Sequence, residues 1–180
     1  MSLARDRILD AAEARLLEHG PRGLVLEAVA EDAAVSKGGL LYHFPSKDAL
    51  VDGLCQRMLD GFDRAQRDLA AADPEPAGRW TRAYLRSTVD EAGEPVDTSA
   101  RLLAGILAAI GGDPARLAAL RERFARWQRR LEDDGLDPAT ASLVRLAADG
   151  LWLSQLLGLP QLPAELDRRV VAALRDLTRP

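Results

Sequence analysis

Apolar residues recur at intervals of three and four along most of the chain, and no segment alternates with a period of two for long. This spacing places apolar side chains on one face of an α-helix, whereas a strand requires the two-residue period. Aromatic residues make up only 4% of the chain, so leucine and alanine must fill the core, and both favour helices. We therefore expect an all-α protein with about nine helices.

The first third of the chain is predicted to form three helices followed by a longer one. Gly20-Pro21 ends the first, a tight turn at Ala34-Val35 separates the next two, and Ser46 can cap the fourth. This order is typical of a helix-turn-helix head joined to a long connecting helix. The expected ranges are 3–19, 26–33, 37–44 and 46–73.

The third predicted helix has two faces of different chemistry. Leu40 and Phe44 lie one turn apart on one face, and Ser36 can cap the start of the helix. Both lysines of the chain, among its 24 basic residues, fall at or just beyond the other face. Such a face offers donors to phosphates and base edges, which indicates a recognition helix. Its residues are Lys37, Leu41, Tyr42 and His43, followed by Lys47.

The charge of the chain limits how it could bind nucleic acid. The net charge is −4, and the first fifty residues carry six Lys or Arg against eight Asp or Glu. Binding must therefore use a locally cationic face with the acidic side chains turned away, and nonspecific affinity is expected to be low.

The sequence also favours a cytoplasmic location. Cys55 is the single cysteine, so it cannot form an internal disulfide, as suits a reducing compartment. We expect no signal peptide, and the longest apolar stretch, 150–160, is too short to span a bilayer.

The run from Val35 to Asp48, preceded by two helices of this length, resembles the DNA-binding head of the TetR family of bacterial transcriptional regulators. The resemblance is specific over residues 5–52 and implies an all-α homodimer that binds a palindromic operator, usually as a repressor released by a small ligand. It implies a DNA-binding domain at 1–47 and a ligand-binding and dimerisation domain at 48–180. The implied DNA-binding residues are Ser36, Lys37, Gly38, Gly39, Leu41, Tyr42, His43 and Lys47, with His43 and Lys47 on phosphates.

Three departures from the family pattern affect this head. Val25 stands where Thr often opens the second helix, so a capping hydroxyl is missing. Ala34 replaces the usual Gly of the turn, which requires a backbone angle that is not strongly left-handed. Gly39 and Leu41 stand where Thr and Tyr are common, and Leu41 can meet a thymine methyl group but cannot donate a hydrogen bond.

Large side chains beyond residue 50 are candidates to line a mostly apolar ligand cavity. Ordinary core filling is the favoured interpretation for any one of them alone, and only the set as a whole indicates a cavity. If the chain follows the family, the helices that carry these side chains surround the ligand, with Tyr84, Ser87 or Thr88 supplying hydrogen bonds. The predicted ligand-binding residues are Met58, Phe62, Trp80, Tyr84, Ser87, Thr88, Leu103, Phe124 and Trp127.

The last two helices, 139–158 and 163–177, are predicted to form the dimer interface. The first is apolar nearly all round and the second has one apolar stripe, so two copies can make a four-helix bundle. Arg145 and Asp149 are either a local salt bridge or a polar contact between subunits. The predicted interface residues are Arg145, Asp149, Trp152, Leu153, Leu157, Leu166, Val170 and Leu174.

Enzymatic functions find little support in the sequence. It shows no Cys/His metal spacing, no glycine-rich phosphate loop and no Ser/His/Asp set in a suitable context, so we expect no metal, no cofactor and no catalysis. Three further helix starts are predicted: Pro76 opens one helix, and Asp113-Pro114 and Asp137-Pro138 each resemble a capping Asp followed by Pro at the first helical position. The main alternative function is a helical protein-interaction module with a vestigial DNA-binding head.

Overall fold

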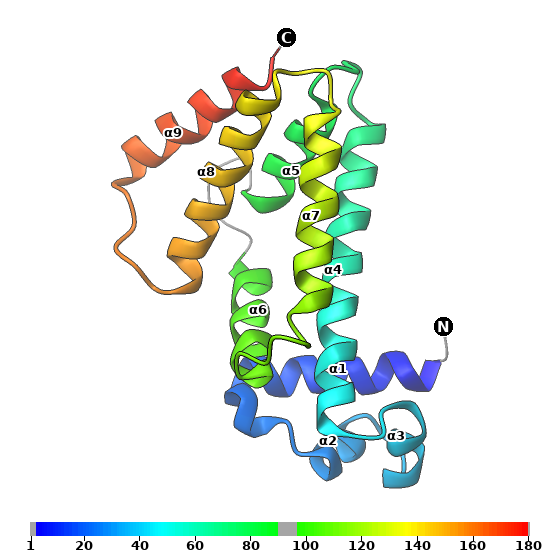
Figure 1. Cartoon of the computed structure of the whole chain (residues 1–180). Helices are drawn as coiled ribbons and strands as arrows, with labels where there is room; N and C mark the ends of the chain where they lie inside the picture. Colours follow the sequence, from blue (N-terminus) through cyan, green and yellow to red (C-terminus); the bar gives the residue numbers. More distant parts are fainter. Residues whose placement is uncertain (1–2, 90–96, 180) are drawn as a thin grey trace. The chain divides into compact units, whose positions relative to one another are not determined.

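The computed structural model describes residues 3–89 and 97–179, and the regular elements in these ranges are nine α-helices and one short 3-10 helix (Figure 1). This confirms the predicted all-α fold. The chain forms two compact units, one from Met1–Leu59 with Arg101–Leu120 and the other from Asp60–Ala100 with Arg121–Pro180. The predicted functional division at residue 47 stays a prediction. None of the described helices is long and apolar enough to cross a membrane.

The first unit holds the predicted head. Its core consists of buried apolar side chains from every helix of the head, among them Ile8, Leu16, Val29 and Leu40. Leu50 and Leu54, one turn apart on the long helix, are buried too. Its elements are α1 (Leu3–His19), η1 (Gly20–Gly23), α2 (Leu26–Asp32), α3 (Lys37–His43), the first half of α4 (Lys47–Ala71), and most of α6 (Asp97–Ile110).

Helix α6 packs against α1 within the first unit. A Cβ atom on Gly105 would lie 2.8 Å from Cγ of Leu16, so only glycine permits this approach. Arg116, which follows α6, donates to the carboxylates of Asp48 and Asp52 at 3.0 Å each. The segment after α6 is thereby tied to the beginning of α4.

The second unit contains the other half of α4 and four further helices. Helix α8 contacts both α5 and α9 (Figure 1). Buried side chains on these helices include Leu85, Leu131, Val144 and Val171. The four helices are α5 (Arg79–Thr88), α7 (Ala118–Glu132), α8 (Pro138–Leu156) and α9 (Ala164–Leu177).

Several helix starts agree with the sequence. The Ser36 hydroxyl accepts from the backbone N–H of Gly39 at 3.0 Å, and the Ser46 hydroxyl accepts from that of Ala49 at 3.1 Å. Asp137 accepts from the N–H of Thr140 at 2.9 Å, with Pro138 as the first helical residue, as predicted. These side chains satisfy N–H groups that a helix start leaves without intrahelical partners.

Two predicted helix starts are wrong. Helix α7 begins at Ala118 because the Asp113 carboxylate closes a turn onto the N–H of Ala115 at 2.9 Å instead of capping a helix. Helix α5 begins at Arg79, beyond the predicted Pro76, after Gly78 with φ of 78°. Its first N–H groups are capped by a residue far along the chain. The buried Asp134 carboxylate accepts from the N–H of Trp80 at 3.0 Å and from that of Thr81 at 2.7 Å.

Candidate nucleic-acid interface and interior polar sites

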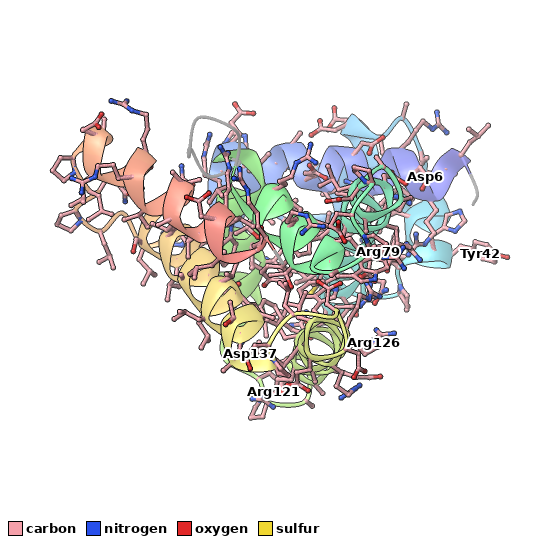
Figure 2. All side chains as sticks on the ribbon, turned by 90° about the horizontal axis from the view of Figure 1, so that it is seen from above. Asp6, Tyr42, Arg79, Arg121, Arg126 and Asp137 are labelled. Atoms are coloured by element: carbon pink, nitrogen blue, oxygen red, sulfur yellow. The ribbon has the colours of Figure 1, made fainter. Side chains whose placement is uncertain are left out.

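Helix α3 presents the outward face that its sequence predicts. Leu40 and Phe44 are buried, whereas the Tyr42 side chain is 84% exposed. Figure 2 shows Tyr42 projecting away from the helices around it. The Tyr42 and His43 rings meet edge to face with centroids 5.1 Å apart. An aromatic side chain held this far into solvent has no packing role in the subunit, which favours a role in contacting a partner.

The two lysines beside this face are oriented by acceptors within the head. Nζ of Lys47 donates to the carbonyl oxygen of Pro21 at 2.9 Å. An ammonium has three donors, so this bond leaves others for a phosphate. Nζ of Lys37 lies 2.6 Å from the Glu27 carboxylate of α2. Glu27 was not among the predicted site residues, and its side chain sets the local charge beside the recognition face.

Two of the departures from the family pattern can be compared with the backbone of the head. Ala34 has φ of 52°, so its backbone is left-handed. The expectation from the sequence, that this angle is not strongly left-handed, is wrong. Val25 precedes α2 and makes no side-chain cap, as expected.

A Cβ atom on Gly38 would meet only the Ser36 hydroxyl at 4.0 Å, so packing within the head does not require glycine there. A glycine at such a site favours close approach of an external partner.

Four aromatic side chains predicted to line a ligand cavity form one cluster in the second unit. The Phe62 ring lies 4.8 Å from Trp127 and 5.5 Å from Tyr84, centroid to centroid. Phe124 lies 4.9 Å from Trp127. Trp80 stands apart from this cluster, with the Arg130 guanidinium 4.4 Å above its ring. Of the remaining predicted residues, Met58 and Leu103 belong to the first unit.

The hydroxyls predicted to bind the ligand are engaged within the protein. Tyr84, only 2% exposed, donates its hydroxyl to Asp149 at 2.5 Å. The Ser87 and Thr88 hydroxyls both donate to the backbone carbonyl of Tyr84, at 2.9 and 2.8 Å. Small hydroxyls often bond back to the preceding turn of their own helix. All three hydroxyls therefore donate within the protein, and their role in ligand binding stays a prediction.

Arg145 and Asp149 form the salt bridge that their spacing predicts, at 2.7 Å. The pair lies inside the unit, because Asp149 also accepts from Tyr84 of α5 and Arg145 donates to the Gln128 side chain of α7 at 2.5 Å. Burial raises the pKa of Asp149, and the hydrogen bonds from Tyr84 and Arg145 oppose that rise. The same burial and the nearby carboxylate raise the pKa of Tyr84. The local salt bridge is thus present within the subunit, and a place of the two residues in the dimer interface stays a prediction.

The remaining interface predictions divide by exposure. Leu174 is 6% exposed and packs in its own subunit, which argues against a contact with a second subunit. Trp152 and Val170 are half-buried, while Leu153, Leu157 and Leu166 are exposed. Leu143 and Leu146, which were not predicted, are exposed on α8 as well. From residue 143 onward, the exposed positions of α8 and its C-cap residue are 143, 146, 150, 153 and 157, which step by three and four along one face.

A second polar cluster joins α4 to α7. The Asp63 carboxylate accepts from Nε1 of Trp127 at 2.6 Å and also from Arg123, which binds Asp60 at 2.8 Å. Nη1 of Arg130 lies 4.0 Å from Asp63, beyond hydrogen-bonding distance. This atom and Nε2 of Gln66 are both buried without a hydrogen-bond partner among the described residues. Gln66 was not predicted, although it continues the four-residue series of Leu54, Met58 and Phe62 as a polar residue.

The fold and the α3 face together define an all-α protein with a helix-turn-helix head and a second helical unit. Residues 8–54 match the family of bacterial regulatory proteins named tetR. Residues 78–179 match the family described as the tetracyclin repressor-like C-terminal domain. The chain belongs to the TetR family of bacterial transcriptional regulators.

Individual relatives agree with this assignment. The HTH-type transcriptional repressor KstR2 of Rhodococcus jostii is 29% identical over 120 residues, which are 67% of this chain and 54% of KstR2. The chain spans about half the length of the curated relatives it matches first.

Among solved structures, a TetR-family regulator from a Rhodococcus species has a TM-score of 0.73 and 25% identity, covering 98% of this chain and 99% of its own. The multidrug binding protein EbrR, complexed with malachite green, has a TM-score of 0.62 and 30% identity, covering 94% and 96%.

Proposed function

We propose that the protein is a homodimeric, sequence-specific DNA-binding regulator. In this proposal it represses transcription from a palindromic operator until a small organic ligand releases it. The observation that carries the proposal is the outward face of α3, where exposed Tyr42 lies between Lys37 and Lys47 on a helix capped by Ser36. Repression is favoured over activation by the similarity to KstR2, a repressor by its name.

Direct base readout suits the residues of this face. Lys37 and Tyr42 carry donors for base edges, Leu41 offers an apolar contact to thymine, and Gly38 permits close approach of the backbone. Lys47 would hold a phosphate and fix the position of the helix in the major groove. His43, half-buried beside Tyr42, would take a second phosphate.

A second copy of the chain is the proposed partner of the exposed leucines on α8 and α9. Large exposed apolar side chains at 143, 146, 153 and 157 give α8 a continuous stripe, with Gly150 at its centre. A small residue there allows two helices to approach closely, and spacing by three and four suits packing at a shallow crossing angle. Leu166 and Leu177 extend the apolar surface onto α9. Two such helix pairs would close a four-helix bundle about a two-fold axis.

The effector would bind in the second helical unit. EbrR, similar to this chain over most of its length, was solved with malachite green, an organic dye. The half-buried rings of Phe62 and Phe124 provide the aromatic surface that such a ligand would contact. Ligand binding would weaken operator affinity by altering the separation of the two heads, since each must meet a half-site about 34 Å from its twin.

The test is selection of DNA from a random library by the full chain, followed by gel shift on the enriched sequences. We expect enrichment of a palindrome bound with one dimer per site. If no sequence is enriched although the protein is folded, the regulator proposal fails. The exposed leucines would then favour a helical interaction module with a vestigial head.

A further inference from the structure

Three helices of the second unit contribute side chains in successive layers. Phe62 of α4, Trp127 of α7 and Tyr84 of α5 form an aromatic layer, with centroid distances of 4.8, 5.5 and 6.2 Å. Helices α4 and α7 run in the same direction, because Asp60 pairs with Arg123 and Asp63 with Trp127. Helix α5 runs the other way, since Tyr84 contacts Trp127 while Trp80 contacts Arg130.

One helical turn beyond the aromatic layer, the same three helices place Gln66, Arg130 and Trp80. Residues three or four apart share a helix face, so Gln66 follows Phe62, Arg130 follows Trp127, and Trp80 precedes Tyr84. The Arg130 guanidinium lies 4.4 Å from the centroid of the Trp80 ring, and its Nη1 lies 4.0 Å from Asp63, one turn before Gln66. The second layer therefore gathers an amide, a guanidinium and an indole face.

Two nitrogen atoms of this second layer have no hydrogen-bond partner in the described protein. Gln66 is 1% exposed, and its Nε2 has no hydrogen-bond partner there. Nη1 of Arg130 is likewise buried without a hydrogen bond. Asp63, whose carboxylate lies 4.0 Å from Arg130, already accepts from Arg123 and Trp127. A buried donor without an acceptor destabilises the folded protein, so the layer is suited to an acceptor supplied from outside.

We infer that Gln66 and Arg130 form the polar end of the effector site and bind a carboxylate on a small molecule with an apolar body. This inference rests on the proposed function, because it identifies what the effector-binding unit would recognise. A carboxylate supplies two acceptor oxygens and the charge that complements Arg130. The aromatic layer beside it takes the apolar body. The Arg130 side chain is 30% exposed, so a ligand can reach it from the surface.

This assignment distinguishes the chain's ligand from a cationic one. EbrR was solved with malachite green and with ethidium, whereas the second layer here offers two donors and a positive charge. An organic cation would leave both donors unsatisfied and would face Arg130. An organic acid satisfies both, and the Trp80 face supports the guanidinium that binds it.

The test compares three probes that share a phenyl ring on a four-carbon chain and differ in the terminal group. They are 4-phenylbutyrate, 4-phenylbutanol and 4-phenylbutylamine. Binding to the wild-type dimer is followed by calorimetry and by the fluorescence of Trp80 and Trp127. We expect the acid to bind at least about tenfold more tightly than the alcohol or the amine. Equal affinity for the three probes, tighter binding of the amine or of malachite green, or no binding of the acid at about 10 mM would overturn the inference.

Two variants locate the site. Gln66→Leu should weaken binding of the acid about tenfold, and it should raise the melting temperature of the ligand-free protein because it removes an unsatisfied buried donor. Arg130→Met should also weaken binding of the acid, while Arg129→Met, at an exposed position one residue away, should not. A lower melting temperature with unchanged acid binding in Gln66→Leu would show that the amide is an ordinary structural group.

Operator binding without any probe separates this inference from the proposed function. Gln66→Leu and Arg130→Met should bind the selected operator as the wild type does. Normal operator binding together with no acid-specific effect overturns the carboxylate site alone. Absence of operator binding by the wild type overturns the regulator proposal, whatever the probes do.

Discussion

Lys37 of the recognition helix is paired with Glu27 of α2, with 2.6 Å between Nζ and the carboxylate oxygen. The hydrogen bond from Lys37 holds the pKa of Glu27 below its ordinary value. Both side chains are exposed, so the pair contributes little to the stability of the head. Its consequence lies in binding, because Lys37 must leave Glu27, or share it, to reach DNA.

We expect Glu27→Gln to raise affinity for DNA by roughly two- to fivefold, with a larger relative gain on nonspecific than on operator DNA. The reason is the loss of a competing carboxylate that repels phosphates. Fluorescence anisotropy on the selected operator and on a scrambled duplex measures both gains. Glu31→Gln removes the same charge from the exposed surface of α2 and serves as control. Equal effects of the two variants would show that the gain in affinity comes from the change in net charge and not from the loss of the Lys37–Glu27 pair.

Tyr42→Ala and Lys47→Ala should weaken operator binding in different ways. Loss of the exposed ring at Tyr42 should cost about tenfold in affinity and relax preference at the base that it contacts. Loss of Lys47 should weaken binding to all DNA sequences alike, and it should reduce the slope of log affinity against log salt concentration by about one. Titrations at several salt concentrations separate these outcomes. Wild-type affinity in both folded variants would remove the recognition-helix assignment.

Local sequence rules predicted the head well. Leu40 and Phe44 are buried and Tyr42 is exposed because the helical period alone separates the two faces of α3. Capping preferences, which are also local, placed the caps Ser36, Ser46 and Asp137, each of which binds an N–H group three residues away.

Features that depend on distant residues were not predictable. The cap of α5 comes from Asp134, more than fifty residues along the chain from Trp80. Tyr84 finds its acceptor in Asp149 of α8, so its hydroxyl could be mistaken for a ligand donor. Gln66 could have been noticed as a polar residue on an apolar stripe, but its relation to Arg130 depends on how α4 and α7 align.

Leu153→Glu should dissociate the proposed dimer. Leu153 is exposed at the middle of the α8 stripe, so a charge there adds no strain within the subunit but would be buried between two subunits. Sedimentation at micromolar concentration should show a wild-type dimer and a mutant monomer that no longer retains palindromic DNA. Ala125→Glu, exposed on α7, is the control and should remain dimeric. A monomeric wild type would contradict the interface.

Asp149→Asn should change how stability depends on pH. Burial raises the pKa of Asp149 in the folded protein above its ordinary value of 3.8, so the folded state binds the proton more strongly than the unfolded state does. The contribution of Asp149 to stability therefore falls as pH rises from 3.8 through the folded pKa. Asparagine keeps an acceptor for Tyr84 but does not titrate. The stability of the wild type minus that of the variant, from urea denaturation at several pH values, should decline across this window; a constant difference would contradict the assignment.

Ala34→Gly should stabilise the head. Ala34 has φ of 52°, a left-handed conformation that costs a residue with a Cβ atom roughly 1–2 kcal/mol, whereas glycine adopts it freely. Glycine loses more entropy on folding, so the net gain should be about 0.5–1 kcal/mol. Ala28→Gly, inside α2, is the matched control and should destabilise by about 1 kcal/mol because its backbone is helical. Chemical denaturation measures both changes. If both glycine variants destabilise the protein equally, the turn at Ala34 is not strained.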